Sequence, residues 1–198
     1  MNRIRIMSAA VLLVCGAGVW ATELVGVRGS GTQFTSTMDA KINGKPVKLV
    51  LTGVALRQKY FLNVYAIGSY VQEGANVHTA EQLATVDAPK QLHLVMERDV
   101  TGKDIAEAFL LAIRQNYPMP AFDAEVARLT KTMREMSFNK GDHIYLTHQP
   151  GVGLHCNVVN KGEFTIDNPA FSRAVWDIYL GANNIGEGIK KGLTSRLK

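Results

Sequence analysis

An arginine inside an otherwise apolar stretch is the first residue of this sequence whose chemistry needs an explanation. Arg57 follows the apolar run Leu49–Leu56 and precedes Lys59-Tyr60-Phe61. Burying a guanidinium group costs free energy unless an anion or a set of acceptors meets it. Two interpretations stay open from the residues alone. Arg57 either ends a strand and reaches solvent or an acid, or it receives an anion at the bottom of an apolar pocket, helped by a tyrosine hydroxyl.

A second group of candidates contains metal-binding and nucleophilic residue types: His143, His148, His155 and Cys156. A tight turn at Pro150-Gly151 would place His148 and His155 on one face of a hairpin, because side chains alternate along a strand. His143 and Cys156 would then share the other face. The four side chains could not surround one tetrahedral ion, and each same-face pair would be diagonal. We therefore predict no metal site and no cysteine nucleophile at this hairpin.

Composition and motifs exclude several other kinds of function. The chain has 198 residues, of which 46% are hydrophobic, with 22 Lys and Arg against 17 Asp and Glu. Residues 1–21 hold two arginines and no acid, so the rest of the chain carries 20 basic and 17 acidic residues, which argues against a nucleic-acid partner. There is no Gly-x-Ser-x-Gly motif, phosphate-binding loop or dinucleotide motif, so we predict no cofactor.

The N-terminal residues 1–21 have the pattern of a secretory signal peptide. Arg3 and Arg5 precede the short apolar run Met7–Val14, and the segment ends on the small residue Ala21. The uncharged stretch is shorter than the about 20 residues that a membrane-spanning helix needs. We predict that the protein is exported, to the periplasm or out of the cell, and has no stable membrane span after processing. Whether the segment is cleaved or kept as an anchor stays open.

Strand patterns occur in two blocks. Between Val25 and Glu73, the dipeptide Asn43-Gly44 lies between alternating residues and predicts a two-residue hairpin turn. Tyr60–Val71 is a long run with little polar content, which predicts a strand covered on both faces. Further strands are predicted at Gln91–Arg98, His143–His148, Val152–Val159 and Glu163–Ile166.

Helix patterns separate and follow these strands. Thr101 predicts the N-cap of a helix that ends near Asn116, and a second helix is predicted at residues 121–136. Asn168-Pro169 predicts the start of a third helix ending at Gly181, and a fourth covers about residues 185–196. The order of two strand blocks, each followed by two helices, predicts an α+β domain over residues 22–198. Its antiparallel sheet would carry the helices on one face.

An ordered set of segments resembles the chalcone isomerase superfamily over about residues 37–198. The set consists of Gly53-Val54-Ala55-Leu56-Arg57, the segment from Asn63 to Val71, Val100-Thr101-Gly102 and the segment from Trp176 to Gly181. The resemblance implies an open-faced β-sandwich, in which a large antiparallel sheet and a layer of helices enclose a cleft. The superfamily includes plant isomerases that close chalcones to flavanones, fatty-acid-binding members and non-catalytic relatives.

The resemblance also implies roles for individual residues. The family arginine, which meets a carbonyl in isomerases and a carboxylate in fatty-acid binders, falls on Arg57. The isomerase threonine falls on Tyr65, but the spacing from Arg57 leaves open whether Tyr65 or Tyr70 faces the cleft. The catalytic tyrosine and asparagine fall on Ile105 and Ala112, whose side chains cannot donate a hydrogen bond to a developing enolate. These five residues are the predicted ligand-binding set, and no catalytic residue is predicted.

Three functions follow from this pattern. The first is an exported, non-catalytic protein that binds a fatty acid or similar amphipathic anion through Arg57. The second is an isomerase or intramolecular lyase in which Arg57 polarises a carbonyl and Tyr70 or Tyr117 serves as a relocated acid or base. The third is a scaffold or interaction protein whose cleft is filled by its own side chains, such as Phe109 or Met136.

Overall fold

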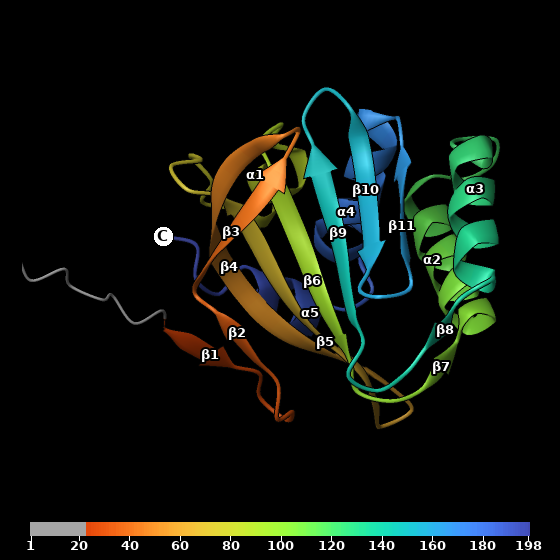
Figure 1. The fold of residues 1–198 in the computed structure, drawn as a ribbon, viewed down its shortest axis with the longest axis horizontal. Coiled ribbons are helices and arrows are strands. Elements are labelled where there is room, and N and C mark those ends of the chain that lie inside the picture. The colour runs from red at the N-terminus through yellow and green to blue at the C-terminus, as the bar shows by residue number, and fades with distance from the viewer. Residues whose placement is uncertain (1–22) are drawn as a thin grey trace, which may run out of the picture.

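A seven-stranded antiparallel sheet with helices on one of its faces forms the described part of the chain (Figure 1). The computed structural model describes residues 23–198, and the predicted signal peptide, residues 1–21, lies outside the described residues. Across the sheet the strands are β11 (Gly162–Ile166), β10 (Gly153–Val158), β9 (His143–Gln149), β6 (Lys90–Met96), β5 (Leu62–Gln72), β4 (Lys45–Lys59) and β3 (Thr37–Ile42).

Two short strand pairs and the helices complete the fold. Strand β1 (Leu24–Gly26) pairs with β2 (Gln33–Thr35), and β7 (Val100–Thr101) pairs with β8 (Ser137–Phe138). The helices are α1 (Ala80–Thr85), α2 (Gly102–Asn116), α3 (Asp123–Arg134), α4 (Pro169–Leu180) and α5 (Glu187–Leu193). Within residues 23–198, no helix combines the length and apolar character needed to cross a bilayer.

The α+β architecture and the main local signals of the sequence are confirmed. Asn43 and Gly44 form the turn between β3 and β4, with φ angles of 51° and 75°. The Thr101 hydroxyl accepts a hydrogen bond from the backbone N–H of Asp104 and begins α2. The side chain of Asn168 caps α4 in the same way, with Pro169 at the first helical position.

Some element boundaries differ from the sequence prediction. Tyr60 and Phe61 form a tight turn, so β5 begins only at Leu62. The turn was not predicted because neither residue is of the kind that usually adopts a positive φ. Helix α1 was also not predicted, although Thr79 and Gln82 form a capping box at its start.

The predicted faces of the β9–β10 hairpin are wrong. The strands are joined by three residues instead of two, so Cys156 pairs with Leu146 and His148 pairs with Leu154. Adding one residue to a hairpin loop moves every following side chain to the opposite face. Cys156 and His148 therefore both face the helices, whereas His143 lies on the opposite face. Cys156 is fully buried, and burial raises the pKa of its thiol to about 12.

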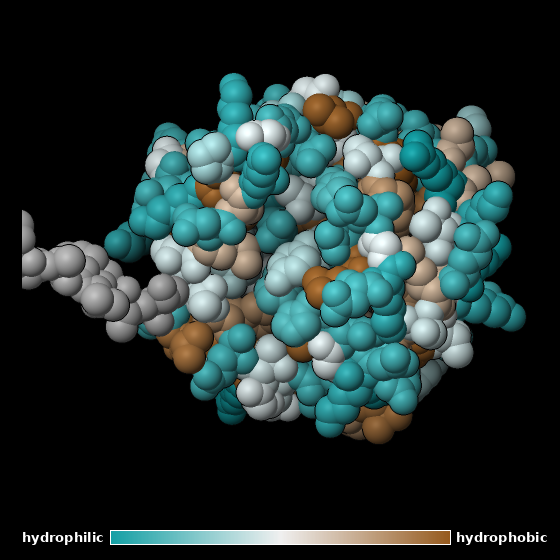
Figure 2. Space-filling model, in the orientation of Figure 1, coloured by the Kyte–Doolittle hydropathy of each residue, from teal (hydrophilic) through white to brown (hydrophobic). Residues whose placement is uncertain are grey.

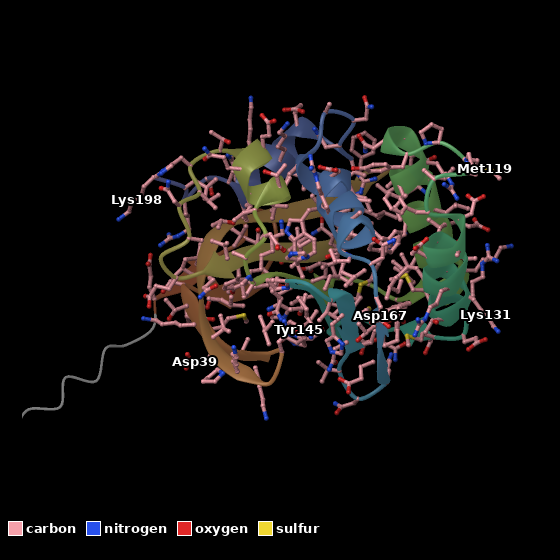
Figure 3. All side chains as sticks on the ribbon, turned by 90° about the horizontal axis from the view of Figure 1, so that it is seen from above. Asp39, Met119, Lys131, Tyr145, Asp167 and Lys198 are labelled. Atoms are coloured by element: carbon pink, nitrogen blue, oxygen red, sulfur yellow. The ribbon has the colours of Figure 1, made fainter. Side chains whose placement is uncertain are left out.

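The sheet separates two apolar clusters. The larger cluster lies between the sheet and the helices, and the smaller one lies on the other face, where Val25, Val27 and Phe34 of the β1–β2 region cover part of the sheet. Figure 3 views the sheet from above, with Tyr145 on the side of the sheet away from α4. Strand β5 serves both clusters because successive side chains point to opposite faces.

Helix α5 is held closely against β4. A Cβ atom on Gly53 would overlap the carbonyl of Gly192, and a Cβ on Gly192 would lie 2.6 Å from the carbonyl oxygen of Val54. The Thr52 hydroxyl donates to the carbonyl of Leu193 at 2.8 Å. This packing brings the segment that precedes α5 over the end of β4 where Arg57 lies.

Candidate functional site

Arg57 lies near the end of β4, directly opposite Tyr65 of β5. The two residues are cross-strand partners, and an irregularity in the pairing follows at Gln58. The Arg57 side chain is half-buried, and its Nη1 atom donates to the carbonyl oxygen of Ile185 at 3.1 Å. Among residues 23–198, no carboxylate forms a salt bridge with Arg57. Arg57 therefore does not end in an internal ion pair.

A tyrosine pair adjoins this arginine. The hydroxyl of Tyr65 lies 3.3 Å from the hydroxyl of Tyr179 on α4, and both side chains are buried. Burial raises the pKa of both phenols, and the positive charge of Arg57 partly opposes the increase at each. Both hydroxyls are therefore protonated near neutral pH. Two hydroxyls that share one hydrogen bond retain one further hydrogen, which can be donated to another acceptor.

Arg57 and the tyrosine pair together form a site suited to an anion. An arginine has five N–H donors, and in the described residues one hydrogen bond from Arg57 to a carbonyl is present. Its planar guanidinium can hold a carboxylate through two parallel hydrogen bonds. The remaining tyrosine hydrogen supplies a further donor beside it. The arrangement can bind and orient a negatively charged or strongly polarised oxygen.

Ile105 and Ala112 lie on α2 and face the same apolar cluster as Tyr65 and Tyr179. Their side chains are buried and contain no polar atom. Helix α2 packs against α4, which carries Tyr179. The two residues therefore contribute apolar packing and no side-chain hydrogen bond. They are compatible with an alkyl chain and offer nothing to stabilise an enolate.

Tyr70 does not belong to this site. It lies five residues after Tyr65 on β5, so its side chain points to the opposite face and joins the smaller cluster. Its hydroxyl donates to the carbonyl of Thr35 at 2.9 Å. The sequence left open whether Tyr65 or Tyr70 faces the site, and the structure places Tyr65 beside Arg57. The prediction that Tyr70 belongs to the ligand-binding set is therefore wrong.

Tyr117, the other proposed acid or base, is already engaged. Its hydroxyl donates to the carboxylate of Asp177 on α4. Burial and this carboxylate raise the pKa of Tyr117 to about 12. A phenol held protonated by a neighbouring carboxylate is poorly suited to act as a base near neutral pH.

Arg57, Tyr65 and Tyr179 do not line either of two open hollows on the surface of the described residues. One lies between the start of α2 and the β7–β8 pair and includes Met136. The other lies between the β3–β4 turn and the loop before β6. Tyr65 and Tyr179 belong to the larger apolar cluster, which also includes Phe109.

Tyr179 is the site residue that the sequence prediction missed. It lies in the segment from Trp176 to Gly181, which carries part of the family resemblance. Its position three residues after Trp176 on a helix with a buried face could have indicated that it points inward. Nothing in the sequence indicates that it would meet Tyr65, which is more than a hundred residues away.

Comparison with known proteins supports the resemblance drawn from these residues. The sequence matches the family model described as chalcone isomerase-like over residues 30–194. The chain belongs to the chalcone isomerase-like family. The match covers most of the chain and includes Arg57, Tyr65 and Tyr179. No curated protein matches the sequence.

A solved structure of another protein has the same fold. The crystal structure of a fatty-acid binding protein from Arabidopsis thaliana superposes on this chain with a TM-score of 0.68 and 18% sequence identity. The alignment covers 87% of this chain and 96% of the plant protein. At this level of identity the likeness establishes the fold, and the predicted fold class is confirmed.

Proposed function

We propose that this chalcone isomerase-like protein binds a fatty acid or a similar amphipathic anion and performs no catalysis. The anionic head group would be held by Arg57 and by the free hydrogen of the Tyr65–Tyr179 pair. The observation that carries this proposal is an arginine with no ionic partner among residues 23–198, next to a buried pair of hydroxyls and an apolar cluster. The fatty-acid binding activity named for the plant structure supports it.

The alkyl chain would enter between the sheet and the helices. Each buried methylene contributes about 0.8 kcal/mol, so a chain of a dozen contributes roughly 10 kcal/mol before the costs of binding. Some of this free energy would be used to move apolar side chains, because the cluster next to Tyr179 is packed. Helix α2 would provide part of the wall through Ile105 and Ala112.

Export is the second part of the proposal. The basic and then apolar pattern of residues 1–21 supports it. An exported lipid-binding protein would meet its ligand outside the cytoplasm. The mass of the protein recovered from the exported fraction of its host would show whether residues 1–21 are removed, and recovery only from the cytoplasm would contradict export.

Calorimetric titration with saturated C12–C18 fatty acids tests the head-group site. We expect Arg57→Ala to bind about 10- to 100-fold more weakly than the wild type, since hydrogen bonds to charged groups contribute about 1.5–3 kcal/mol. Lys59→Ala is the matched control, because it removes an equal charge from the exposed end of the same strand. The corresponding fatty alcohols should bind the wild type weakly and respond little to Arg57→Ala.

The same titration separates binding from a scaffold role, which is the second candidate function. The packing of Phe109 in the cluster next to the tyrosine pair favours a core filled by its own side chains. If the wild type binds none of the fatty acids, or if Arg57→Ala binds them equally well, the head-group proposal is wrong. Decay of chalcone absorbance in the presence of the protein, lost in Arg57→Ala, would instead indicate an isomerase.

A further inference from the structure

The turn between β4 and β5 exposes three consecutive large side chains. Tyr60 is 83% exposed, Phe61 is 100% exposed and Leu62 is 55% exposed. Other exposed large apolar residues, such as Leu111 on α2, occur singly. Figure 2 shows hydrophobic atoms at the lower end of the molecule, where Figure 1 places this turn. We call Tyr60, Phe61 and Leu62 the β4–β5 tip.

The backbone of the tip is strained for the residues it contains. Tyr60 and Phe61 have φ angles of 51° and 65°, close to those of Asn43 and Gly44 at the other end of β4. A positive φ is common for asparagine and glycine and unfavourable for bulky side chains. The Phe61 side chain buries no surface within the chain. The fold alone therefore gives no reason for two aromatic residues at this turn.

Exposed cations flank the tip. Of the five lysines and arginines between residues 40 and 72, Lys59 adjoins the tip and Arg57 is half-buried, whereas the other three lie toward the β3–β4 turn at the far end of β4. Lys59 is exposed, and its ammonium lies 5.6 Å from the centre of the Tyr60 ring. Asn63 donates to the carbonyl of Gly29 at 3.0 Å, which brings the turn with the exposed Arg28 next to the tip. An apolar point flanked by cations complements an anionic lipid surface.

We propose that the β4–β5 tip docks on an anionic lipid surface, with Phe61 and Leu62 in the interfacial layer and Tyr60 at the headgroup level. Aromatic side chains favour this region because they combine an apolar ring with a polar or polarisable edge. Arg57 lies three residues before Tyr60, about 10 Å along the strand. Docking would thus place the proposed head-group site close to the surface, but the proposal does not depend on that site.

Binding to vesicles of equal parts phosphatidylcholine and phosphatidylglycerol tests the proposal with the full chain. The double variant Tyr60→Asn/Phe61→Gly introduces the residues that suit the turn, so its unfolding temperature should equal or exceed that of the wild type. We expect its vesicle affinity to fall about tenfold or more, because two exposed aromatic side chains are lost. Leu111→Gln, which removes an exposed leucine from α2, should bind like the wild type.

A local reporter distinguishes the tip from residues 1–22, which are present in every variant. In Phe61→Trp, the added fluorescence relative to the wild type should shift to shorter wavelength on these vesicles and shift less on phosphatidylcholine alone. Unchanged emission from the introduced tryptophan would overturn the proposal, as would equal vesicle affinity of the double variant and the wild type. Dimerisation that is lost in the double variant, without any vesicle-induced shift, would assign the tip to a second copy of the chain instead.

Binding to vesicles through the tip can be tested separately from binding of a fatty acid at Arg57. The double variant should keep the wild-type affinity for fatty acids in solution, and Arg57→Ala should keep the vesicle affinity. A change in vesicle affinity that follows Arg57 rather than the tip would also overturn the docking proposal.

Discussion

A tyrosine hydroxyl on one face of strand β5 has a different kind of hydrogen-bond partner from a tyrosine hydroxyl on the other face. Tyr70 faces the smaller cluster and donates to a backbone carbonyl, so its one hydrogen is used within the fold. Tyr65 faces the helices, and its partner is another hydroxyl with its own hydrogen. The first arrangement is complete, whereas the second keeps a donor available next to Arg57. Residue type alone does not show whether a tyrosine hydroxyl keeps a hydrogen available for a ligand, whereas its hydrogen-bond partner does.

The two faces also differ in how much movement they permit. On the helical face, the backbone of α5 lies directly against the backbone of β4 at Gly53 and Gly192. On the other face, Gly68 lies under the ring of Phe34, a side chain that can rotate. Close backbone contact resists displacement more than side-chain contact does. Variants on each face can test this difference.

The largest expected effect comes from adding one methyl group to each face. Gly53→Ala should destabilise the protein by about 3 kcal/mol or more, because the new Cβ overlaps the backbone of α5. Gly68→Ala should cost about 1 kcal/mol, since its Cβ would lie 3.0 Å from Phe34 Cδ1 and the ring can shift. Urea unfolding measures both. Equal losses of stability in the two variants would mean that α5 and the Phe34 ring can be displaced from the sheet equally easily.

The second effect is the response to acid, to which His93 contributes on the face with the smaller cluster, in addition to His148 on the helical face. Burial, with a smaller contribution from His143, lowers the pKa of His93 to about 3. Between this value and the ordinary pKa near 6.5, the unfolded chain binds a proton that the folded chain does not, so stability falls as the pH falls. We expect a loss of about 1 kcal/mol per pH unit between pH 6 and pH 4.

The variant His93→Gln should lack this part of the acid dependence, whatever its stability at pH 7. The measurement is urea unfolding at several pH values for both proteins. Tyr65→Phe serves as the control from the helical face, because it should keep the wild-type slope. If the free energy of unfolding changed equally with pH in the wild type and in His93→Gln, His93 would not be the source of this acid dependence.

The smallest effect is a difference between two tyrosine-to-phenylalanine variants, of which one should lose more stability and the other more fatty-acid affinity. Tyr70→Phe leaves the carbonyl of Thr35 without its partner and should cost about 1–2 kcal/mol of stability, with fatty-acid affinity unchanged. Tyr65→Phe removes a longer hydrogen bond and should cost less stability, but it should weaken fatty-acid binding about threefold to tenfold. Thermal unfolding and calorimetry together detect this difference. Tyr70→Phe weakening binding as much as Tyr65→Phe would remove the tyrosine pair from the site.

Much of the fold could be predicted because its signals are local. The Asn43-Gly44 turn, the Thr101 cap and the Asn168-Pro169 helix start each depend on a few neighbouring residues. The turn at Tyr60-Phe61 was missed for the same reason. The local conformational preferences of aromatic residues argue against a turn there. The pairing of β4 with β5 imposes the positive φ angles that Tyr60 and Phe61 disfavour.

The candidate site was predicted only in part. Arg57 was indicated by its place in an apolar stretch and then by family resemblance, whereas Tyr65 came from the resemblance. The cross-strand pairing brings the two together. The choice between Tyr65 and Tyr70 could have been made from the sequence, because an odd separation on one strand puts two side chains on opposite faces. The faces of His148 and Cys156 could not, because they depend on whether a loop has two residues or three.

The sequence by itself determined where α2 and α4 begin, where the β3–β4 turn lies and which family the chain resembles, since these depend on short-range preferences and on ordered residue patterns. The tertiary structure alone decided that Tyr179 completes the pair with Tyr65, that Arg57 donates to a carbonyl and forms no ion pair within residues 23–198, and that an aromatic turn projects from the surface. Those outcomes depend on register and packing between segments far apart in the chain, where a change of one residue in a loop reverses which side chains meet.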